Sequence, residues 1–315
     1  TNINALGNSQ PSTFSWIATT NGNVTGESTS AQAGGIINDN INNVTGIDQT
    51  VVYTVTPTGT NGCVGNPFTV TVTVKSEPLG GAGTASTCSD AALSYNLQTA
   101  NINTLGNSQA STFSWIAADN INVTGESTTD QAGGFINDNI NNVTGVDQAV
   151  VYTVTPTGTN GCTGNTFTVT VTVKSEPSGV NSTTTTCSDI AVGYNLQTSN
   201  INALGNNQAS TFSWIAASNL NVTGESTTAQ TGATITDVIN NITNADQTVE
   251  YTVTPTGTNG CAGNSFTVTV TAKSEPEGAA GTASTCSDVA LAYDLQTTNI
   301  NALGNSQPST FSWIA

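Results

Sequence analysis

Strict alternation of apolar and polar residues is the strongest pattern in this chain. Over residues 166–174 (TFTVTVTVK), Phe167, Val169, Val171 and Val173 alternate with threonines. Because successive side chains of a β-strand point to opposite faces, this segment predicts a half-buried strand with a hydrated threonine face.

Two more segments repeat this pattern. Tyr152 and Val154 share one face of residues 150–156, and Phe113 and Trp115 share one face of TFSWIA. Weaker strands are predicted around residues 86–90, 93–98, 121–124 and 133–140. No segment has sustained helical periodicity, and the Asn-rich residues 136–142 predict at most one short helical turn, since Asn is a poor helix former. Secondary structure is therefore expected to be β throughout.

The same elements recur with a period of 99 residues. The recurring segments are TFSWIA from 13, 112, 211 and 310, YTVTPTGTNGC from 53, 152 and 251, KSEP from 75, 174 and 273, and TCSD from 87, 186 and 285. A unit of this length is too long for a solenoid repeat and fits one small independent domain. The chain is expected to be an array of beads on a string.

The domain boundary is best placed at KSEP and the variable Gly-containing stretch that follows it, because Pro, Gly and small polar residues here follow a long strand. We call residues 1–77 repeat 1, a partial domain lacking its first strand. Residues 78–176 are repeat 2 and residues 177–275 are repeat 3, both whole. Residues 276–315 are repeat 4, the start of a further domain.

About seven short strands in each repeat predict an immunoglobulin-like β-sandwich. One large ring can bridge the two sheets of such a domain. We therefore expect the tryptophan of each TFSWIA segment to lie in the core: Trp16, Trp115, Trp214 and Trp313. The alternative is that these rings stack on sugars.

Six cysteines, two in each period, suggest disulfides and an oxidising compartment. They are Cys63, Cys88, Cys162, Cys187, Cys261 and Cys286. With the TCSD cysteine near the start of the first strand and the other cysteine in the loop before the last, the two meet at one pole of the sandwich. This geometry predicts the pairs Cys88–Cys162 and Cys187–Cys261, with Cys63 and Cys286 pairing outside this sequence. The alternatives are pairing across KSEP, as in Cys63–Cys88, and free buried thiols.

The composition argues against several classes of function. The chain has 3 Lys, no Arg and no His against 20 Asp plus Glu, for a net charge of -17. Nucleic-acid binding and attachment to anionic membranes need clustered cations, which are missing here, and no apolar run is long enough to insert into a bilayer. With no His, the commonest general base and metal ligand is missing. We therefore expect a non-catalytic extracellular chain without a cofactor.

The sequence offers one candidate cation site. Two aspartates flank an Asn-rich stretch in each repeat and offer oxygen ligands to Ca²⁺. They are Asp39, Asp48, Asp138, Asp147, Asp237 and Asp246. The competing interpretation is a polar loop with Asx turns. The single lysine of each repeat, Lys75, Lys174 or Lys273, is expected at an exposed strand end beside a glutamate.

The segments TFSW, YTVTPTGTNGC and FTVTVTVKSEP, together with the TCS cysteine, resemble the PKD-like, immunoglobulin-like tandem domains of giant surface proteins of Bacteroidota. The chain is most similar to gliding-motility adhesins of the SprB-like type, which the type IX secretion system exports. It departs from the standard PKD pattern because FSWIA is not followed by an acidic DFGDG turn. The resemblance implies a filament on the outer surface of a Gram-negative cell, moved by motor and track proteins, that grips a substratum.

The leading hypothesis is therefore a structural repeat segment of a cell-surface adhesin filament. Its partners would be neighbouring repeats of the same chain, and other regions would contact surface glycans or the substratum. A carbohydrate-binding accessory module of a secreted glycoside hydrolase is one alternative. A subunit of a multi-chain surface layer or pilus is another.

Overall fold

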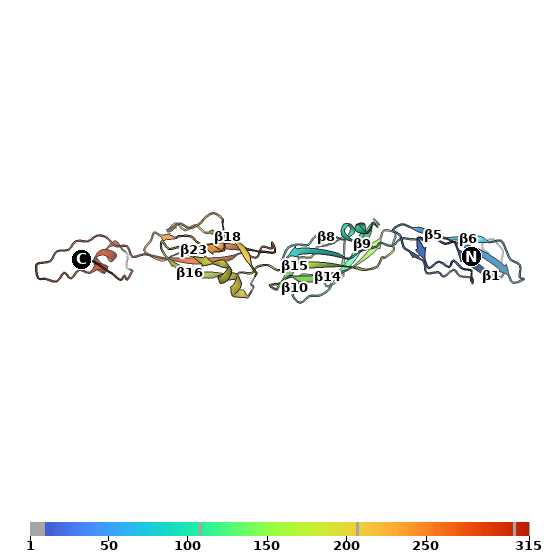
Figure 1. Ribbon diagram of the computed structural model, residues 1–315, viewed down its shortest axis with the longest axis horizontal. Coiled ribbons are helices and arrows are strands. Elements are labelled where there is room, and N and C mark those ends of the chain that lie inside the picture. Colours follow the sequence, from blue (N-terminus) through green and yellow to red (C-terminus); the bar gives the residue numbers. More distant parts are fainter. Residues whose placement is uncertain (1–9, 107–108, 206–207, 305–306, 315) are drawn as a thin grey trace. The chain divides into compact units, whose positions relative to one another are not determined.

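Residues 10–106, 109–205, 208–304 and 307–314 are described by a computed structural model (Figure 1). The chain divides into two compact units. The first comprises Thr1–Asn141 with Gln148–Val173, and the second comprises Asn142–Asp147 with Lys174–Ala315. The first unit holds repeat 1 and most of repeat 2, and the second holds repeats 3 and 4.

Repeat 2 is an all-β sandwich. Its elements are β7 (Gly83–Cys88), β8 (Tyr95–Asn96), η1 (Gln98–Ile102), η2 (Asn103–Leu105), β9 (Ser111–Ala117), β10 (Val123–Thr124), β11 (Gln131–Ala132), β12 (Phe135–Ile136), β13 (Asn141–Asn142), β14 (Gln148–Gly158) and β15 (Phe167–Lys174). One layer is a five-stranded sheet in the order β11-β9-β14-β15-β7. Two small ladders, β8 with β12 and β10 with β13, complete the fold.

Repeat 3 has the same elements in the same order. They are β16 (Ser182–Cys187), β17 (Tyr194–Asn195), η3 (Gln197–Ile201), η4 (Asn202–Leu204), β18 (Ser210–Ala216), β19 (Val222–Thr223), β20 (Gln230–Thr231), β21 (Thr234–Ile235), β22 (Asn240–Asn241), β23 (Gln247–Gly257) and β24 (Phe266–Lys273). Its first strand, β16, is parallel to β24, with Ser182 opposite Val268 and Cys187 opposite Lys273. All other strand pairs of this sheet are antiparallel.

Repeat 1 is described from its TFSWIA strand onward. Its strands are β1 (Ser12–Ala18), β2 (Val24–Thr25), β3 (Gln32–Ala33), β4 (Asn42–Asn43), β5 (Gln49–Gly59) and β6 (Phe68–Val74). The sheet has four strands in the order β3-β1-β5-β6. Val70 and Val72 on its last strand are half-buried, whereas their counterparts Val169 and Val171 in repeat 2 are fully buried.

The apolar residues that alternate along the long strands form the core, as the sequence predicts. In repeat 2, Phe167, Val169, Val171 and Val173 are buried along β15, and threonines face the other way. Leu97, Ile102, Ile136 and Ile140 are fully buried and belong to the same core cluster as Trp115 and Tyr152. Each such apolar side chain stabilises the folded state by roughly 1.5–3 kcal/mol.

Residues 136–142, where the sequence allows at most one short helical turn, form none. Ile136 ends β12, and Asn141 and Asn142 form β13, so both ends of this segment are extended. The helical structure lies elsewhere, in a single π-helical turn and a 3₁₀ turn, η1 and η2, and repeat 4 carries the same pair, η5 (Gln296–Ile300) and η6 (Asn301–Leu303). None of the helices in the described ranges is long and apolar enough to cross a membrane.

Candidate functional site at the repeat junctions

A buried serine lies where repeat 1 meets repeat 2. Ser76, the second residue of KSEP, is only 4% exposed. Its backbone N–H donates to Asp48 Oδ1 of its own repeat at 2.9 Å. This bond fixes the chain just after β6 ends, so KSEP is held against repeat 1.

Repeat 2 completes the environment of this serine. Ser76 Oγ donates to Gln109 Oε1 at 3.0 Å, and Asn160 Nδ2 donates to the Ser76 carbonyl oxygen at 2.8 Å. Gln109 precedes β9, and Asn160 lies in the TNGC loop between β14 and β15. Two loops of repeat 2 therefore hydrogen-bond to one residue at the end of repeat 1.

Two other residues of KSEP add contacts: Lys75 reaches repeat 2, and Pro78, the first residue of repeat 2, packs against a loop of its own repeat. Lys75 Nζ donates to the Asn160 carbonyl oxygen at 3.1 Å. A Cβ placed on Gly164 would lie 2.0 Å from the Pro78 carbonyl oxygen, so the two backbones touch and only glycine fits there. The Lys75 amine thus bonds to the next repeat, an interaction not expected from the sequence.

The second unit contains the same junction between KSEP of repeat 2 and the loops of repeat 3. Lys174 Nζ donates to the Asn259 carbonyl oxygen at 3.3 Å, and Asn259 Nδ2 donates to the Ser175 carbonyl oxygen at 2.8 Å. Ser175 Oγ donates to Gln208 Oε1 at 3.2 Å. Asp147 Oδ1 accepts the Ser175 N–H at 2.9 Å. Every partner is displaced by one full period from its counterpart in the first junction.

Repeat 4 begins a third copy of this junction. The Ser274 N–H donates to Asp246 Oδ1 at 3.1 Å, and Ser274 Oγ donates to Gln307 Oε1 at 2.9 Å. Half of these bonds join neutral amide, hydroxyl and carbonyl groups, and each of the others has one charged partner, an aspartate or a lysine. Because none of them pairs two opposite charges, salt should weaken them little. The arrangement is suited to fixing one repeat on the next.

The aspartates predicted as Ca²⁺ ligands have separate protein partners. Asp39 accepts bonds from Ser28 N, Ser28 Oγ and Tyr53 Oη at 2.7, 2.7 and 2.8 Å. Asp48 instead accepts the junction N–H of Ser76. No group of three His, Cys, Asp or Glu side chains gathers within the described ranges. The Ca²⁺ site stays a prediction.

Burial alone would raise the pKa of Asp39. The hydrogen bonds from Ser28 and Tyr53 outweigh it and hold that pKa below its ordinary value. In repeat 2 the same carboxylate, Asp138, accepts Tyr152 Oη at 2.7 Å. Burial, then this hydrogen bond and the carboxylate charge, raise the pKa of Tyr152 above its ordinary value. The tyrosine therefore keeps its proton at neutral pH and donates to this carboxylate.

The tryptophans of the first three repeats lie in the cores. Trp16, Trp115 and Trp214 are 4–5% exposed, and each meets a core tyrosine edge-on, Trp115 and Tyr152 at 5.7 Å between ring centroids. Trp313 departs from the prediction because it is 78% exposed. Residues 307–314 form no strand, whereas TFSWIA of repeat 2 pairs with β14, so the Trp313 ring has no sheet beside it to pack on.

The predicted cysteine pairs are wrong. Cys88 and Cys261 are each disulfide-bonded, whereas Cys63, Cys162, Cys187 and Cys286 are free thiols, so neither predicted pair forms. The reason is visible in repeat 3, where Cys187 is the last residue of β16 and lies opposite Lys273, the end of β24. Cys261 precedes the start of β24. The length of that strand separates these two poles by roughly 23 Å, which no disulfide spans.

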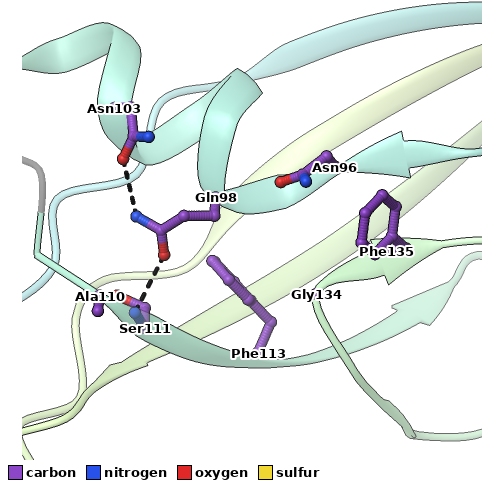
Figure 2. Close-up of a pocket in the computed structure, with 8 residues that line it drawn as sticks. All are labelled: Asn96, Gln98, Asn103, Ala110, Ser111, Phe113, Gly134 and Phe135. Atoms are coloured by element: carbon purple, nitrogen blue, oxygen red, sulfur yellow. Dashed lines mark hydrogen bonds between the residues drawn. The ribbon is translucent and has the colours of Figure 1, made fainter.

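A hollow on the surface of repeat 2 is a separate feature from the junctions (Figure 2). Its lining residues are Asn96, Gln98, Asn103, Ala110, Ser111, Phe113, Gly134 and Phe135. The Gln98 amide is fully used, because Nε2 donates to Asn103 Oδ1 and Oε1 accepts the Ser111 N–H. Phe135 is 49% exposed, and repeat 3 has Thr234 in its place. Phe135 is thus a half-exposed aromatic ring close to side-chain amides, at a position where repeat 3 has no ring.

A family model described as "PKD-like domain" matches residues 1–78, 85–177 and 184–276. The chain belongs to the PKD-like domain family. The three PKD-like matches together cover most of the sequence, and they account for the tandem all-β, immunoglobulin-like fold. No curated protein matches the chain.

Solved structures resemble the PKD-like repeats in fold only. Drosophila N-cadherin EC1-4 is 11% identical with a TM-score of 0.22, over 83% of this chain and 66% of that one. An endo-fucoidan hydrolase from glycoside hydrolase family 107 is 12% identical with a TM-score of 0.23, over 82% of this chain and 38% of that one. BT4661, a SusE-like surface polysaccharide-binding protein from Bacteroides thetaiotaomicron, is 10% identical with a TM-score of 0.26, over 72% and 52%. This chain spans under two thirds of each of them.

Proposed function

We propose that this chain is a non-catalytic structural segment of an extracellular cell-surface adhesin filament, which holds distance and carries load between other parts of the protein. The observation that carries the proposal is the junction, built twice in full and begun a third time from the same residue types at the same periodic spacing. A chain selected only for separate binding domains has no need of a repeated, buried joint. The PKD-like family and the net charge of -17, which keeps neighbouring chains apart, support this role.

The finer proposal is that the filament serves gliding motility and surface attachment, after export by type IX secretion. Its support is the resemblance of YTVTPTGTNGC, FTVTVTV and the TCS cysteine to SprB-like repeats. Export can be tested in a gliding bacterium whose own filament carries these three repeats. Loss of surface exposure in a type IX secretion mutant is expected, and unchanged exposure would contradict this export route.

The structural role is tested by loosening one joint. Inserting a short flexible Gly-Ser segment between Pro177 and Ser178 should widen the distribution of angles between beads in electron micrographs of the isolated chain. A matched insertion after Ile121, a 91% exposed loop position in repeat 2, should leave that distribution unchanged. If the unmodified chain already shows freely jointed beads, the proposed load-bearing role is wrong.

Glycan binding is a second candidate, and the half-exposed Phe135 beside the hollow of Figure 2 favours it. Sugars stack on exposed aromatic rings and bond to neighbouring amides. A glycan array probed with the chain should show binding that Phe135→Thr abolishes, since this change installs the residue of repeat 3. An array without signal would remove this candidate.

A further inference from the structure

Each TNGC loop contains an Asn-Gly pair, a dipeptide that is prone to lose the side-chain amide of its asparagine. The backbone nitrogen after an asparagine attacks Cγ most readily where that next residue is glycine, which has no Cβ to stand in the way. The three pairs of the TNGC loops are Asn61–Gly62, Asn160–Gly161 and Asn259–Gly260. Each has a threonine before it and a cysteine after it, so a difference in reactivity between them comes from the folded structure.

The turn that contains the pair is the same in repeats 1, 2 and 3. In repeat 2 the Asn160 Oδ1 accepts the Cys162 N–H at 3.0 Å. The Gly161 N–H donates to the Gly158 carbonyl oxygen at 2.9 Å. The corresponding atoms of repeats 1 and 3 make the same two bonds. The turn alone therefore does not distinguish the three asparagines.

The junction does distinguish them. Asn160 Nδ2 donates to the carbonyl oxygen of Ser76, and Asn259 Nδ2 donates to that of Ser175, both at 2.8 Å. Both asparagines are half-buried. Asn61 is exposed, and its Nδ2 has no acceptor among the residues that the structure describes. One chain thus holds the same tetrapeptide with its amide engaged in a junction and with its amide open to water.

We propose that Asn160 and Asn259 are deamidation sites, which a closed junction protects and an open junction exposes. In this reaction the backbone nitrogen of the following glycine forms a bond to the asparagine Cγ, and the bond from Cγ to Nδ2 breaks. The glycine proton leaves with the amide nitrogen as ammonia. Water then opens the cyclic imide and gives aspartate or isoaspartate, so the only co-reactant is water.

The closed junction opposes the attack because Cγ has to turn toward the Gly161 nitrogen. That rotation breaks the bond from Asn160 Nδ2 to the Ser76 carbonyl oxygen. Lys75 Nζ also donates to the Asn160 carbonyl oxygen at 3.1 Å and so holds the backbone of the loop in place. Deamidation is therefore limited to the fraction of time for which the junction is locally open.

The product would make an opening permanent. Aspartate and isoaspartate side chains have no N–H to donate, so the Ser76 carbonyl oxygen loses its partner and faces a carboxylate instead. A junction pulled open under load would then close less well afterwards. This consequence for a loaded filament rests on the proposed structural role, whereas protection of the amide by the junction does not.

Incubation of the intact chain at neutral pH gives the first test, with the conversion of each asparagine followed by peptide mass spectrometry. Asn61 and Asn160 are compared because a free thiol follows each of them. Asn61 should deamidate roughly tenfold faster or more, as expected for the loss of one buried hydrogen bond, and the two rates should converge in urea. Equal rates in the folded chain, or a difference that persists in urea, would overturn the proposal.

Two reciprocal variants give the second test. A Cβ added to Gly164 or to Gly263 would meet the carbonyl oxygen of the KSEP proline beside it. Gly164→Ala should speed deamidation of Asn160 about fivefold or more and leave Asn259 unchanged, and Gly263→Ala should do the reverse. Each variant thus carries its own control. Unchanged rates at the loosened junction would contradict protection.

Gln109→Ala removes the acceptor of Ser76 Oγ and loosens the first junction without a steric clash, so it replaces Gly164→Ala if that variant does not fold. Asn160→Asp supplies the reaction product directly. It should speed amide exchange at residues 75–77 about fivefold or more, and the matched Asn61→Asp should leave that exchange unchanged. Unchanged exchange in Asn160→Asp would show that deamidation does not weaken the junction. All these rates are measured without load, so they test the junction separately from the role of the filament.

Discussion

Removing the Asp138 carboxylate tests how the core of one repeat is held. Asp138 accepts three hydrogen bonds, from Ser127 N, Ser127 Oγ and Tyr152 Oη at 2.8, 2.7 and 2.7 Å. The Tyr152 side chain is fully buried, whereas Ser127 is half-buried and can bond to water. An unpaired buried donor costs about 1–3 kcal/mol. We therefore expect Asp138→Ala to lower the free energy of unfolding of repeat 2 by about 3 kcal/mol, roughly 2 from Tyr152 and 1 from Ser127.

Amide hydrogen exchange followed by mass spectrometry measures this loss repeat by repeat in the intact chain. Peptides covering β9 and β14 should exchange about 100-fold faster, because each step of about 1.4 kcal/mol is a factor of ten. The same strands of repeat 3 should be unchanged. Asp130→Ala is the matched control, since this aspartate is exposed and its loss should change exchange by about twofold at most.

A second variant separates the orphaned donor from other effects. In Asp138→Ala with Tyr152→Phe the buried hydroxyl is gone, so the double variant should be less destabilised than the sum of the two single changes. Additive losses, or exchange in repeat 2 that stays within a few-fold of the parent chain, would refute the reasoning that the Tyr152 hydroxyl depends on this carboxylate.

Three further outcomes follow from the core and the joint. The pKa of Tyr152 is raised in the folded state, so the stability that its protonated form contributes is complete below the unfolded pKa of about 10. This stability is lost as pH rises through the folded pKa. Circular dichroism should therefore show unfolding above about pH 10, and the loss should be less steep in Tyr152→Phe. Gly164→Ala should speed exchange at KSEP of repeat 1 because its Cβ meets the Pro78 carbonyl, at a cost of about 1–3 kcal/mol, whereas Gly22→Ala, with open space around it, should not. Asn160→Ala removes a donor from the buried Ser76 carbonyl and should cost about 1–3 kcal/mol by the same readout; no change would show that the joint does not depend on this amide.

The alternation of apolar and polar residues is enough to predict the long strands, but short elements and exact strand ends leave no such pattern in the sequence. The Phe and Val residues of 166–174 point inward as expected because a two-residue period admits one buried face. The turn at Gln98–Ile102 is a single helical turn, too short to produce the periodic pattern of a longer helix. The cysteine pairs were predicted wrongly because the first strand of repeat 2 was placed too late in the sequence. Cys88 is the last residue of β7 and not near its start, so it lies at the opposite end of the sandwich from the one expected.

The junction could not be predicted from its residues. Ser76 is a small polar residue in a Pro-containing stretch, which resembles an exposed linker. Its partners Gln109 and Asn160 are distant in sequence, at separations of 33 and 84, and no periodicity connects them. What marks the site is repetition: Asn160 and Gln109 recur once in every period, as do the serine and the aspartate.

The repeated joint has a consequence for how such a chain can lengthen. Gln109 and Asn160, which bond to Ser76, recur one full period later as Gln208 and Asn259, which bond to Ser175. A further copy of the repeat therefore brings with it the loops that receive the KSEP serine of the repeat before it. Length can grow by duplication without any new kind of contact.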